Sequence, residues 1–292
     1  MTPAQLPVPA TVDSGEEPLT PAGLGIAAEA VSSLPVEHAH RLAAFLDIDE
    51  PLRHGDALPM LWHWAFFTPT TRSSDIGSDG HARLPAAGPT AGLPRRMWAG
   101  GQVTAPGPLR VGIDAARRTK VVAAARKAGR SGPLLIVTLE HEIEQDGRAV
   151  VTERQDLIYR PGGTAVPTPV PGEMPGAPDG GWAQDCLLDP VQLFRFSALT
   201  FNSHRIHFDR EYAATGEGYP GLVVHGPLTA LLLASACQRH GGPIRSFSFR
   251  ASAPHFAGAA FRLLGTRSGE KAELRAIRCD GAVAMEATAE YA

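Results

Sequence analysis

Apolar and polar residues alternate in two separate groups of short runs, a pattern typical of antiparallel strands. The first group predicts strands over residues 97–104, 117–125, 134–142 and 149–159. The second predicts them over residues 246–251, 259–266, 272–278 and 283–291. Helical patterns occupy residues 36–46 and 58–67 before the first group and 227–240 before the second. The run over residues 193–199 is interpreted as one more strand.

Matching turn signals support a repeated layout. Asp146-Gly147 and Asp280-Gly281 each separate two alternating runs, which is the strongest short signal for a hairpin. The spacing Pro-x-x-x-Gly recurs at residues 108–112 and 254–258, each time before the second strand of its group. We therefore predict an α+β fold in which two antiparallel sheets each wrap around a central helix.

A proline- and glycine-rich stretch separates the two groups. Eleven of the twenty residues from 161 to 180 are Pro or Gly, which favours an irregular linker. The predicted organisation is an N-terminal extension, partly flexible, over 1–35, a first half over 36–160, a linker over 161–182 and a second half over 183–292.

The helix predicted over residues 227–240 is apolar on most sides, so we expect it to be buried. Pro227 suits the first helical turn, and Gly241-Gly242 suits the C-terminal stop. The N-terminal amides of a buried helix need acceptors. In an enzyme, a substrate carbonyl can serve as one.

Composition narrows the class of protein. The chain has 292 residues, of which 43% are hydrophobic and 20% charged, and a formal net charge of −3. Scattered, balanced charges exclude a typical nucleic-acid binder. Three distant cysteines predict reduced thiols rather than a disulfide framework or a zinc site. No signal peptide or membrane-length apolar run is recognised, so a soluble cytoplasmic protein is expected.

Polar and ionisable residues concentrate between positions 202 and 209. Asn202, His204, Arg205, His207 and Asp209 lie shortly before the start of the predicted buried helix. A base, a hydrogen-bonding amide and a helix N-terminus together favour thioester chemistry.

These residues also carry a family resemblance. Residues 194–209 (FRFSALTFNSHRIHFD) and 218–227 (GYPGLVVHGP) resemble the catalytic half of MaoC-like enoyl-CoA hydratases. The nearest branch holds 3-methylfumaryl-CoA (mesaconyl-C4-CoA) hydratases and 3-hydroxyacyl-thioester dehydratases. Residues 61–64 (LWHW) and 93–101 (LPRRMWAGG) match that branch in the first half. The resemblance implies a double hot-dog fold whose second half is catalytic and whose first half shapes the acyl pocket.

The resemblance also implies roles for single residues. The family motif Asp-x-Asn-x-x-His falls on Asn202, His204 and His207, so the catalytic His is retained and Asn202 replaces the usual Asp. His207 is the predicted general base, and the Gly226 amide is the predicted donor to the thioester oxygen. Asn202 is predicted to orient water or substrate. The alternatives are a structural histidine, an ordinary helix start and an Asx turn, respectively.

The predicted substrate-binding residues are Arg205, His225, Arg245 and Arg250. Arg205 is a candidate partner for a free carboxylate on the acyl chain, with a CoA phosphate or Asp209 as alternatives. Arg245 and Arg250 are candidate CoA contacts or ordinary exposed strand arginines, and Arg95 and Arg96 are similar. Trp62, Trp64 and Trp98 are expected in the core of the first half.

The predicted activity is that of a hydro-lyase that reversibly hydrates an enoyl-CoA, most specifically 3-methylfumaryl-CoA to citramalyl-CoA. The alternatives are a fatty-acid or polyketide 3-hydroxyacyl-ACP or -CoA dehydratase and an inactive module that binds acyl thioesters. An elongated apolar pocket favours the former, and a short pocket closed by Arg205 favours a dicarboxylyl-CoA. No metal, redox cofactor, nucleic-acid or membrane partner is expected, and a homodimer is left open.

Overall fold

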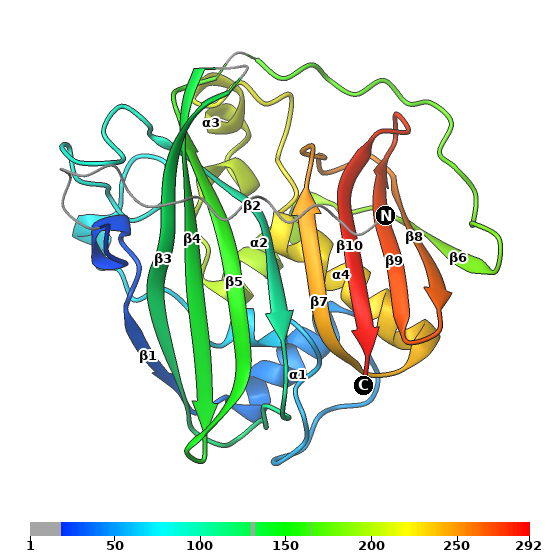
Figure 1. Ribbon diagram of the computed structural model, residues 1–292. Coiled ribbons are helices and arrows are strands. Elements are labelled where there is room, and N and C mark those ends of the chain that lie inside the picture. Colours follow the sequence, from blue (N-terminus) through cyan, green and yellow to red (C-terminus); the bar gives the residue numbers. More distant parts are fainter. Residues whose placement is uncertain (1–18, 130–131, 164) are drawn as a thin grey trace.

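In the computed structural model, which describes residues 19–129, 132–163 and 165–292, the strands form one ten-stranded antiparallel sheet. Its order is β1-β3-β4-β5-β2-β7-β10-β9-β8-β6 (Figure 1). The first half contributes β1 (Glu29–Ser32), β2 (Arg95–Thr104), β3 (Ala115–Gly129), β4 (Gly132–Gln145) and β5 (Arg148–Arg160). The second contributes β6 (Gly181–Cys186), β7 (Ile244–Ala251), β8 (Phe261–Ser268), β9 (Lys271–Arg278) and β10 (Val283–Tyr291). The pairing of β2 with β7 joins the halves.

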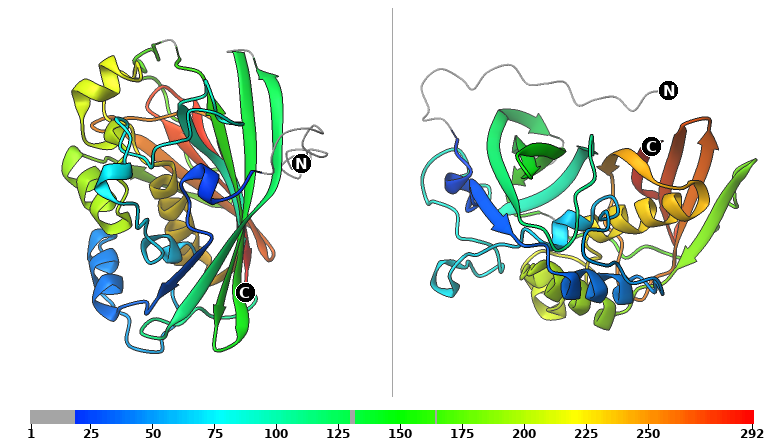
Figure 2. Two further views of the ribbon diagram at one scale, coloured as in Figure 1. Left: turned by 90° about the vertical axis from the view of Figure 1, so that its left-hand side faces the viewer. Right: turned by 90° about the horizontal axis from the view of Figure 1, so that it is seen from below.

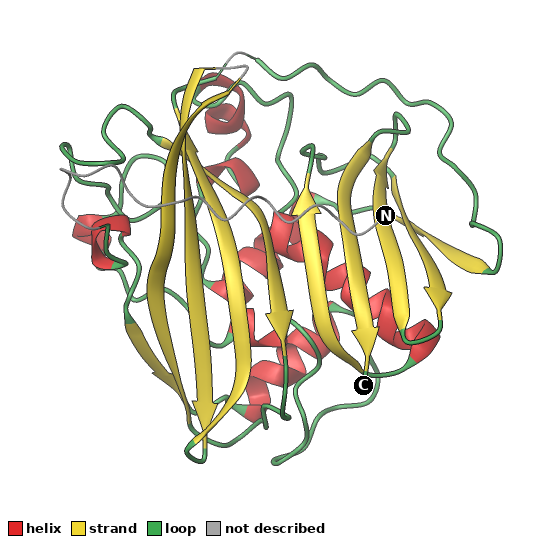
Figure 3. Ribbon diagram, in the orientation of Figure 1, coloured by secondary structure: helices red, strands yellow, loops and turns green. Residues whose placement is uncertain are grey.

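The helices lie on one face of this sheet (Figures 2 and 3). They are α1 (Val36–Phe45), α2 (Pro190–Thr200), α3 (Arg210–Thr215) and α4 (Gly226–Gly241). Short 3-10 turns are η1 (Ala22–Leu24), η2 (Trp62–Ala65), η3 (Ser73–Asp75) and η4 (Arg205–His207). α4 packs against β7, β8, β9 and β10, so it is the central helix that the second-half sheet wraps. This arrangement is the predicted double hot-dog fold.

The two hairpin predictions are confirmed. Asp146 and Gly147 join β4 to β5 with φ angles of 52° and 70°, the left-handed pair that a tight hairpin turn requires. Gly281 joins β9 to β10 with a φ of 80°. The eight strands predicted in the two meanders are also present, with ends shifted by a few residues.

The strand predicted over residues 193–199 is wrong, because these residues belong to α2. The Asp189 side chain accepts a hydrogen bond from the Gln192 backbone N–H, and Gln192 Oε1 accepts one from the Asp189 backbone N–H, which is a capping box. Pro190 opens the helix. The buried positions 193, 196, 197 and 199 follow helical rather than strand spacing. The alternation of Phe and polar residues masked these start signals.

The helix predicted over residues 58–67 is also wrong and reduces to η2. Leu61 precedes it in a left-handed conformation with a φ of 71°, which a continuous α-helix does not tolerate. α1 does not fill the space either, because it packs against α2. The first-half sheet therefore encloses no long helix of its own.

The remaining segments connect these parts. Residues 161–180 contain no helix or strand among those described, and they run from the end of β5 to the edge strand β6 (Figure 1). Of the predicted N-terminal extension, residues 1–18 lie outside the described part, whereas β1 pairs with β3 and belongs to the first-half sheet. No helix among the described residues is long and apolar enough to span a membrane.

Candidate active site

One cavity of about 940 Å³ lies where the two halves meet, and both halves line it. The second half contributes Asn202, His204, His207 and Gly226 to its wall. The first half contributes aromatic and charged side chains, among them Trp64, His81, Arg96, Trp98 and Arg117. The fold therefore brings the three predicted catalytic residues to a single space.

His207 lies on η4 and is 7% exposed. Its Nδ1 is 2.7 Å from the carbonyl oxygen of Val223, so Nδ1 carries the proton and donates, and Nε2 keeps its lone pair. Burial, followed by the neighbouring His204, lowers the pKa of His207 to about 3. The imidazole is consequently neutral near pH 7, the form that accepts a proton from water.

A second histidine, His225, stacks against the His207 ring. The rings of His207 and His225 are stacked with centroids 3.6 Å apart. Nε2 of His225 is 2.9 Å from the Ser197 hydroxyl on α2, which fixes its orientation. His225 is fully buried and precedes the first residue of α4. It contacts His207 and Ser197 rather than forming part of the cavity wall, and its predicted contact with substrate stays a prediction.

Gly226 begins α4 and lines the cavity. As the first helical residue, it has an amide N–H without an acceptor inside the helix. The face of Trp98 lies so close that a Cβ on Gly226 would be 2.8 Å from Trp98 Cε3. A residue without a side chain thus lets the indole pack directly against the helix start, beside the amide predicted to bind the thioester oxygen.

Asn202 lines the cavity immediately after α2 ends. Its Oδ1 accepts a hydrogen bond of 3.0 Å from the His204 amide, which is the Asx-turn contact named as the alternative above. Because the oxygen is used within the turn, the Nδ2 donor is the group that Asn202 can offer to a ligand. Its orienting role stays a prediction.

A loop of the first half around Asp79 and Gly80, which the sequence did not single out, contacts the segment that carries His207. Ser203 Oγ donates to the carbonyl oxygen of Gly80 at 2.5 Å, and the Arg205 amide donates to that of Asp79 at 2.9 Å. A Cβ on Gly80 would lie 1.8 Å from the Ser203 carbonyl oxygen, so this close approach requires glycine. The loop fixes the segment that carries His207.

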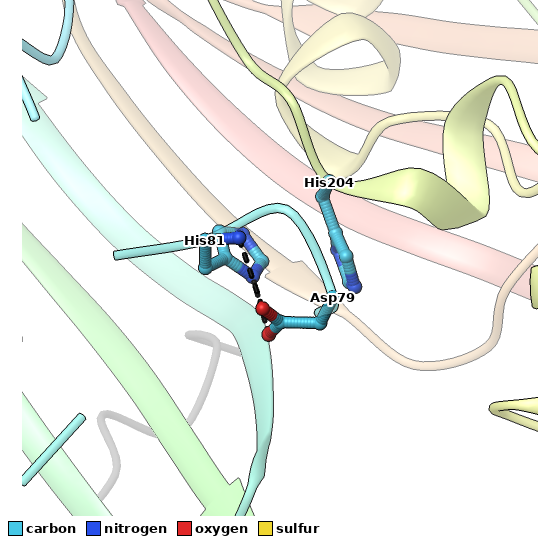
Figure 4. A group of neighbouring side chains, drawn as sticks. All are labelled: Asp79, His81 and His204. Carbon is cyan, nitrogen blue, oxygen red and sulfur yellow. Dashed lines mark hydrogen bonds and ion pairs between the residues drawn. The ribbon is translucent and has the colours of Figure 1, made fainter. Parts of the chain in front are cut away.

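This contact brings Asp79, His81 and His204 together (Figure 4). The rings of His81 and His204 are 4.1 Å apart between centroids, and His81 Nδ1 is 3.2 Å from Asp79 Oδ2. Burial, then the charge of Arg96, lowers the pKa of His81 to about 3. His204 is distant in sequence from Asp79 and His81, so no local pattern joins the three residues.

His204 is held from its other side by a buried ion pair. Its Nε2 is 2.8 Å from Glu217 Oε1, and Arg95 donates to the second Glu217 oxygen at 3.1 Å. Burial raises the pKa of Glu217, but hydrogen bonds and charges from His204 and Arg95 outweigh it and keep the pKa below its ordinary value. Glu217 therefore remains a carboxylate that orients His204.

The spacing of Asp79, His81 and His204 also fits a metal ion, since one ligand atom from each lies within 4.8 Å of the others. Two of these groups are, however, hydrogen-bonded to partners that satisfy them, Asp79 to His81 and His204 to Glu217. The prediction of a reaction without metal stays a prediction.

The three predicted arginine contacts lie elsewhere. Arg205 pairs with Asp209 at 2.6 Å, donates to the Ser78 carbonyl and stacks over Tyr212, and it is not among the cavity-lining residues. The structure thus shows the salt bridge between Arg205 and Asp209, which the sequence analysis gave as an alternative to a substrate contact. Arg245 pairs with Glu270 on the surface, and Arg250 is an exposed residue of β7. Contacts of these two with CoA stay predictions.

The remaining wall of the cavity is unexpectedly polar. Glu153 on β5 accepts hydrogen bonds from His63 at 2.9 Å and from the Trp64 indole at 3.0 Å. His141 on β4 is 2.9 Å from the Thr119 hydroxyl on β3. Of the tryptophans expected in the core, Trp62 is 2% exposed, whereas Trp64 and Trp98 are cavity walls.

Comparison with known proteins identifies the relatives of this chain. Residues 61–257 match the family model for hydroxyacyl-thioester dehydratase type 2, which is about two thirds of the sequence. The chain belongs to this family. It is also 47% identical, over 234 residues, to a mesaconyl-C(4)-CoA hydratase of Chloroflexus aurantiacus, covering 80% of this chain and 83% of that protein. Family and relative agree on a hydro-lyase acting on an acyl thioester.

More distant relatives agree on the fold. A mitochondrial hydroxyacyl-thioester dehydratase type 2 of Schizosaccharomyces pombe is 26% identical, over 71% of this chain and 77% of that protein. The crystal structure of HtdX from Mycobacterium tuberculosis superposes with a TM-score of 0.64 at 19% identity, covering 90% of this chain and all of that one. A MaoC-like dehydratase from Phytophthora capsici gives 0.65 at 18% identity, covering 90% and 94%.

Proposed function

We propose that this protein hydrates mesaconyl-C4-CoA (3-methylfumaryl-CoA) to citramalyl-CoA and catalyses the reverse dehydration. The observation that carries the proposal is the chemistry of the cavity, whose lining combines a neutral histidine and a helix N-terminus of the second half with polar and arginine side chains of the first. Four arginines line it, namely Arg83, Arg96, Arg117 and Arg160. Of the carboxylates that line the cavity, Glu153 of the first half and Glu217 of the second have hydrogen-bond partners of their own. An anionic acyl group suits this wall better than a long alkyl chain does.

In the proposed reaction, the thioester oxygen accepts a hydrogen bond from the Gly226 amide at the start of α4. The helix N-terminus stabilises the negative charge that develops on this oxygen as water adds to the β-carbon. Gly226 thus lowers the barrier on the thioester side of the double bond.

His207 supplies the proton transfers on the other side. Its Nε2 removes a proton from water, whose oxygen bonds to the β-carbon, and the resulting imidazolium protonates the α-carbon. Because burial disfavours the charged ring, the imidazolium is a strong acid and returns the proton readily. Nδ1 keeps its proton on the Val223 carbonyl throughout, so no second base is needed.

A second candidate is dehydration of a 3-hydroxyacyl thioester in fatty-acid or polyketide synthesis. The family match favours it, because the family is named for that reaction. The chemistry is the reverse of the same steps, and the two candidates differ in the acyl group. Charged and hydrogen-bonded side chains on the first-half wall disfavour a long alkyl chain.

The test is a hydration assay with mesaconyl-C4-CoA, crotonyl-CoA and a long-chain 2-enoyl-CoA, followed by loss of enoyl-thioester absorbance. We expect the highest kcat/KM with mesaconyl-C4-CoA. A preference for the long-chain substrate would replace the proposal by the second candidate. Absence of hydration with all three, in protein that is folded by circular dichroism, would favour the inactive binding module.

Other features expected from the sequence remain proposals. They are the cytoplasmic location, the homodimer and the absence of a redox cofactor or metal. The relatives support acyl-CoA as the substrate class, and size-exclusion chromatography with light scattering measures the oligomeric state.

A further inference from the structure

The inner face of the first-half sheet carries a row of buried polar side chains. Thr119, His141 and Glu153 are paired across β3, β4 and β5, and each is at most 5% exposed. In the second half, the corresponding face meets the apolar side of α4. A buried polar row of this kind needs partners, and a cavity beside it provides room for a polar ligand.

Arg117 is the member of this face without an anionic partner. It lies two residues before Thr119 on β3, hence on the same side of the strand, and it lines the cavity. Its Nη1 donates to the Phe67 carbonyl at 3.2 Å, and its guanidinium lies 5.3 Å from the centre of the Phe67 ring. Nε is buried and has no hydrogen-bond partner among the described residues.

Glu153 is a candidate for an ion-pair partner of Arg117, but it does not form that ion pair. It influences Arg117 electrostatically, but its two oxygens accept from His63 and Trp64, and no ion pair joins it to Arg117 in the described part of the chain. Burial lowers the pKa of Arg117, and the charge of Glu153 opposes this only in part. A guanidinium held in this way gains most from an anion that enters the cavity.

We infer that Arg117 binds the free carboxylate of the acyl group and so selects dicarboxylyl-CoA thioesters. With Nη1 engaged by Phe67, the edge formed by Nε and Nη2 remains for two parallel hydrogen bonds to a carboxylate. Arg117, His207 and Gly226 line the same cavity. The inference rests on the proposed hydration of mesaconyl-C4-CoA.

Arg117 takes the role that the sequence analysis offered to Arg205. The guanidinium of Arg205 is neutralised by Asp209 outside the cavity, whereas that of the half-buried Arg117 lies at the cavity wall without an ion-pair partner among the described residues. A substrate with a methyl group in place of the carboxylate leaves Arg117 unpaired. Leaving a buried polar group unpaired is the mechanism by which binding sites reject such analogues strongly.

The experiment compares mesaconyl-C4-CoA with 3-methylcrotonyl-CoA, which carries a methyl group in place of the free carboxylate. The ratio of the two kcat/KM values is measured for the wild type, Arg117→Met and Arg117→Lys. Met removes the charge and retains most of the volume. Lys retains the charge without the paired donors and provides a second variant if Met impairs folding. Arg96→Met is the control, because Arg96 is another arginine of the same wall.

We expect Arg117→Met to lower this ratio on the order of 100-fold. Arg117→Lys should lower it less, and Arg96→Met should leave it within about threefold, a range set by the context dependence of single contacts. Equal effects of Arg117→Met on both substrates, or a selective loss in Arg96→Met instead, would overturn the inference. Wild-type protein that hydrates neither substrate would refute the proposed function itself, and the two failures are thereby distinguished.

Discussion

The two halves of the sheet share a meander and differ in what they enclose. The second half wraps α4, whose buried side chains are mainly Leu and Ala. The first half encloses η2 and a polar row that hydrogen-bonds to it through Glu153, and residues of both line part of the cavity. The comparison shows that one antiparallel scaffold can hold either a helix or a ligand, depending on the inward-facing residues.

The proposed roles of the two halves follow from this difference in what they enclose. A long buried helix supplies a fixed N-terminus, at which Gly226 can polarise a thioester. A half without such a helix has room for the acyl group and for side chains that recognise it. The proposed function assigns catalysis to the second half and specificity to the first, so variants of each half should have separable effects.

The sharpest test of this separation is His207→Ala against His141→Ala. The first removes the proposed base and should lower kcat by about 10³-fold or more. The second removes a buried histidine of the first-half row, which hydrogen-bonds Thr119 rather than the substrate, and should leave kcat within about tenfold. Both are measured by mesaconyl-C4-CoA hydration. Comparable losses in the two variants would contradict a division between the walls.

The next test concerns the stability of the enclosed helix. Leu228→Ala removes a side chain that is fully buried in α4 and should reduce the free energy of unfolding by about 2–5 kcal/mol. Gln155→Ala, on the cavity side of β5, should cost less because its neighbours already border open space. Urea denaturation followed by circular dichroism gives both values. A larger loss for Gln155→Ala would reverse the comparison.

Acid should destabilise the second half through its buried histidines. Burial lowers the pKa of His207 to about 3 and that of His255 to about 4, whereas an unfolded histidine titrates near 6.5. The unfolded state thus binds more protons below pH 6.5, and stability falls as the pH decreases from there towards the folded-state pKa values.

Each such group contributes a slope of at most about 1.4 kcal/mol per pH unit in this window. Urea denaturation between pH 7 and 4.5 measures it. The His255 ring hydrogen-bonds the Thr229 hydroxyl. His255→Gln removes this titrating group and should reduce the slope by up to about 1.4 kcal/mol per pH unit, which corresponds to one proton. An unchanged slope in this variant would show that His255 does not remain neutral.

The smallest expected effect is at Asn202. Asn202→Asp retains the oxygen that accepts from the His204 amide and should retain activity within about tenfold, since the turn survives. Asn202→Ala loses both the turn contact and the Nδ2 donor and should lose more. Hydration kinetics of the two variants rank them. If Ala is as active as Asp, Asn202 has no part in orienting the substrate.

Much of the fold could be predicted where the signal is local. The hairpins at Asp146 and Asp280, the eight meander strands and α4 each follow from a short pattern with one physical meaning. The errors arose where two local signals competed. At α2, aromatic alternation concealed the capping box of Asp189, and before η2 the left-handed Leu61 interrupted an apolar pattern.

The candidate site divides in the same way. The segment with Asn202 and His207 and the helix start at Gly226 stood out because one short stretch of chain carries each. Arg117, His81 and Glu217 could not be found from the sequence, because each becomes significant only beside a residue from another part of the chain. The sequence alone does not distinguish an arginine that lines a cavity, such as Arg117, from one that does not, such as Arg205.

Order along the chain by itself determined the repeated strands and the buried helix, since backbone geometry and burial periodicity act over a few residues. The acid–base candidate came from the resemblance of one short segment to a known family. The tertiary structure decided which arginines line the cavity and which loop holds the segment that carries His207. Pairing of β2 with β7 and the contact of Gly80 with Ser203 bring distant residues together. Burial then changes their chemistry, because a charge or a proton that costs little in water costs much inside the protein.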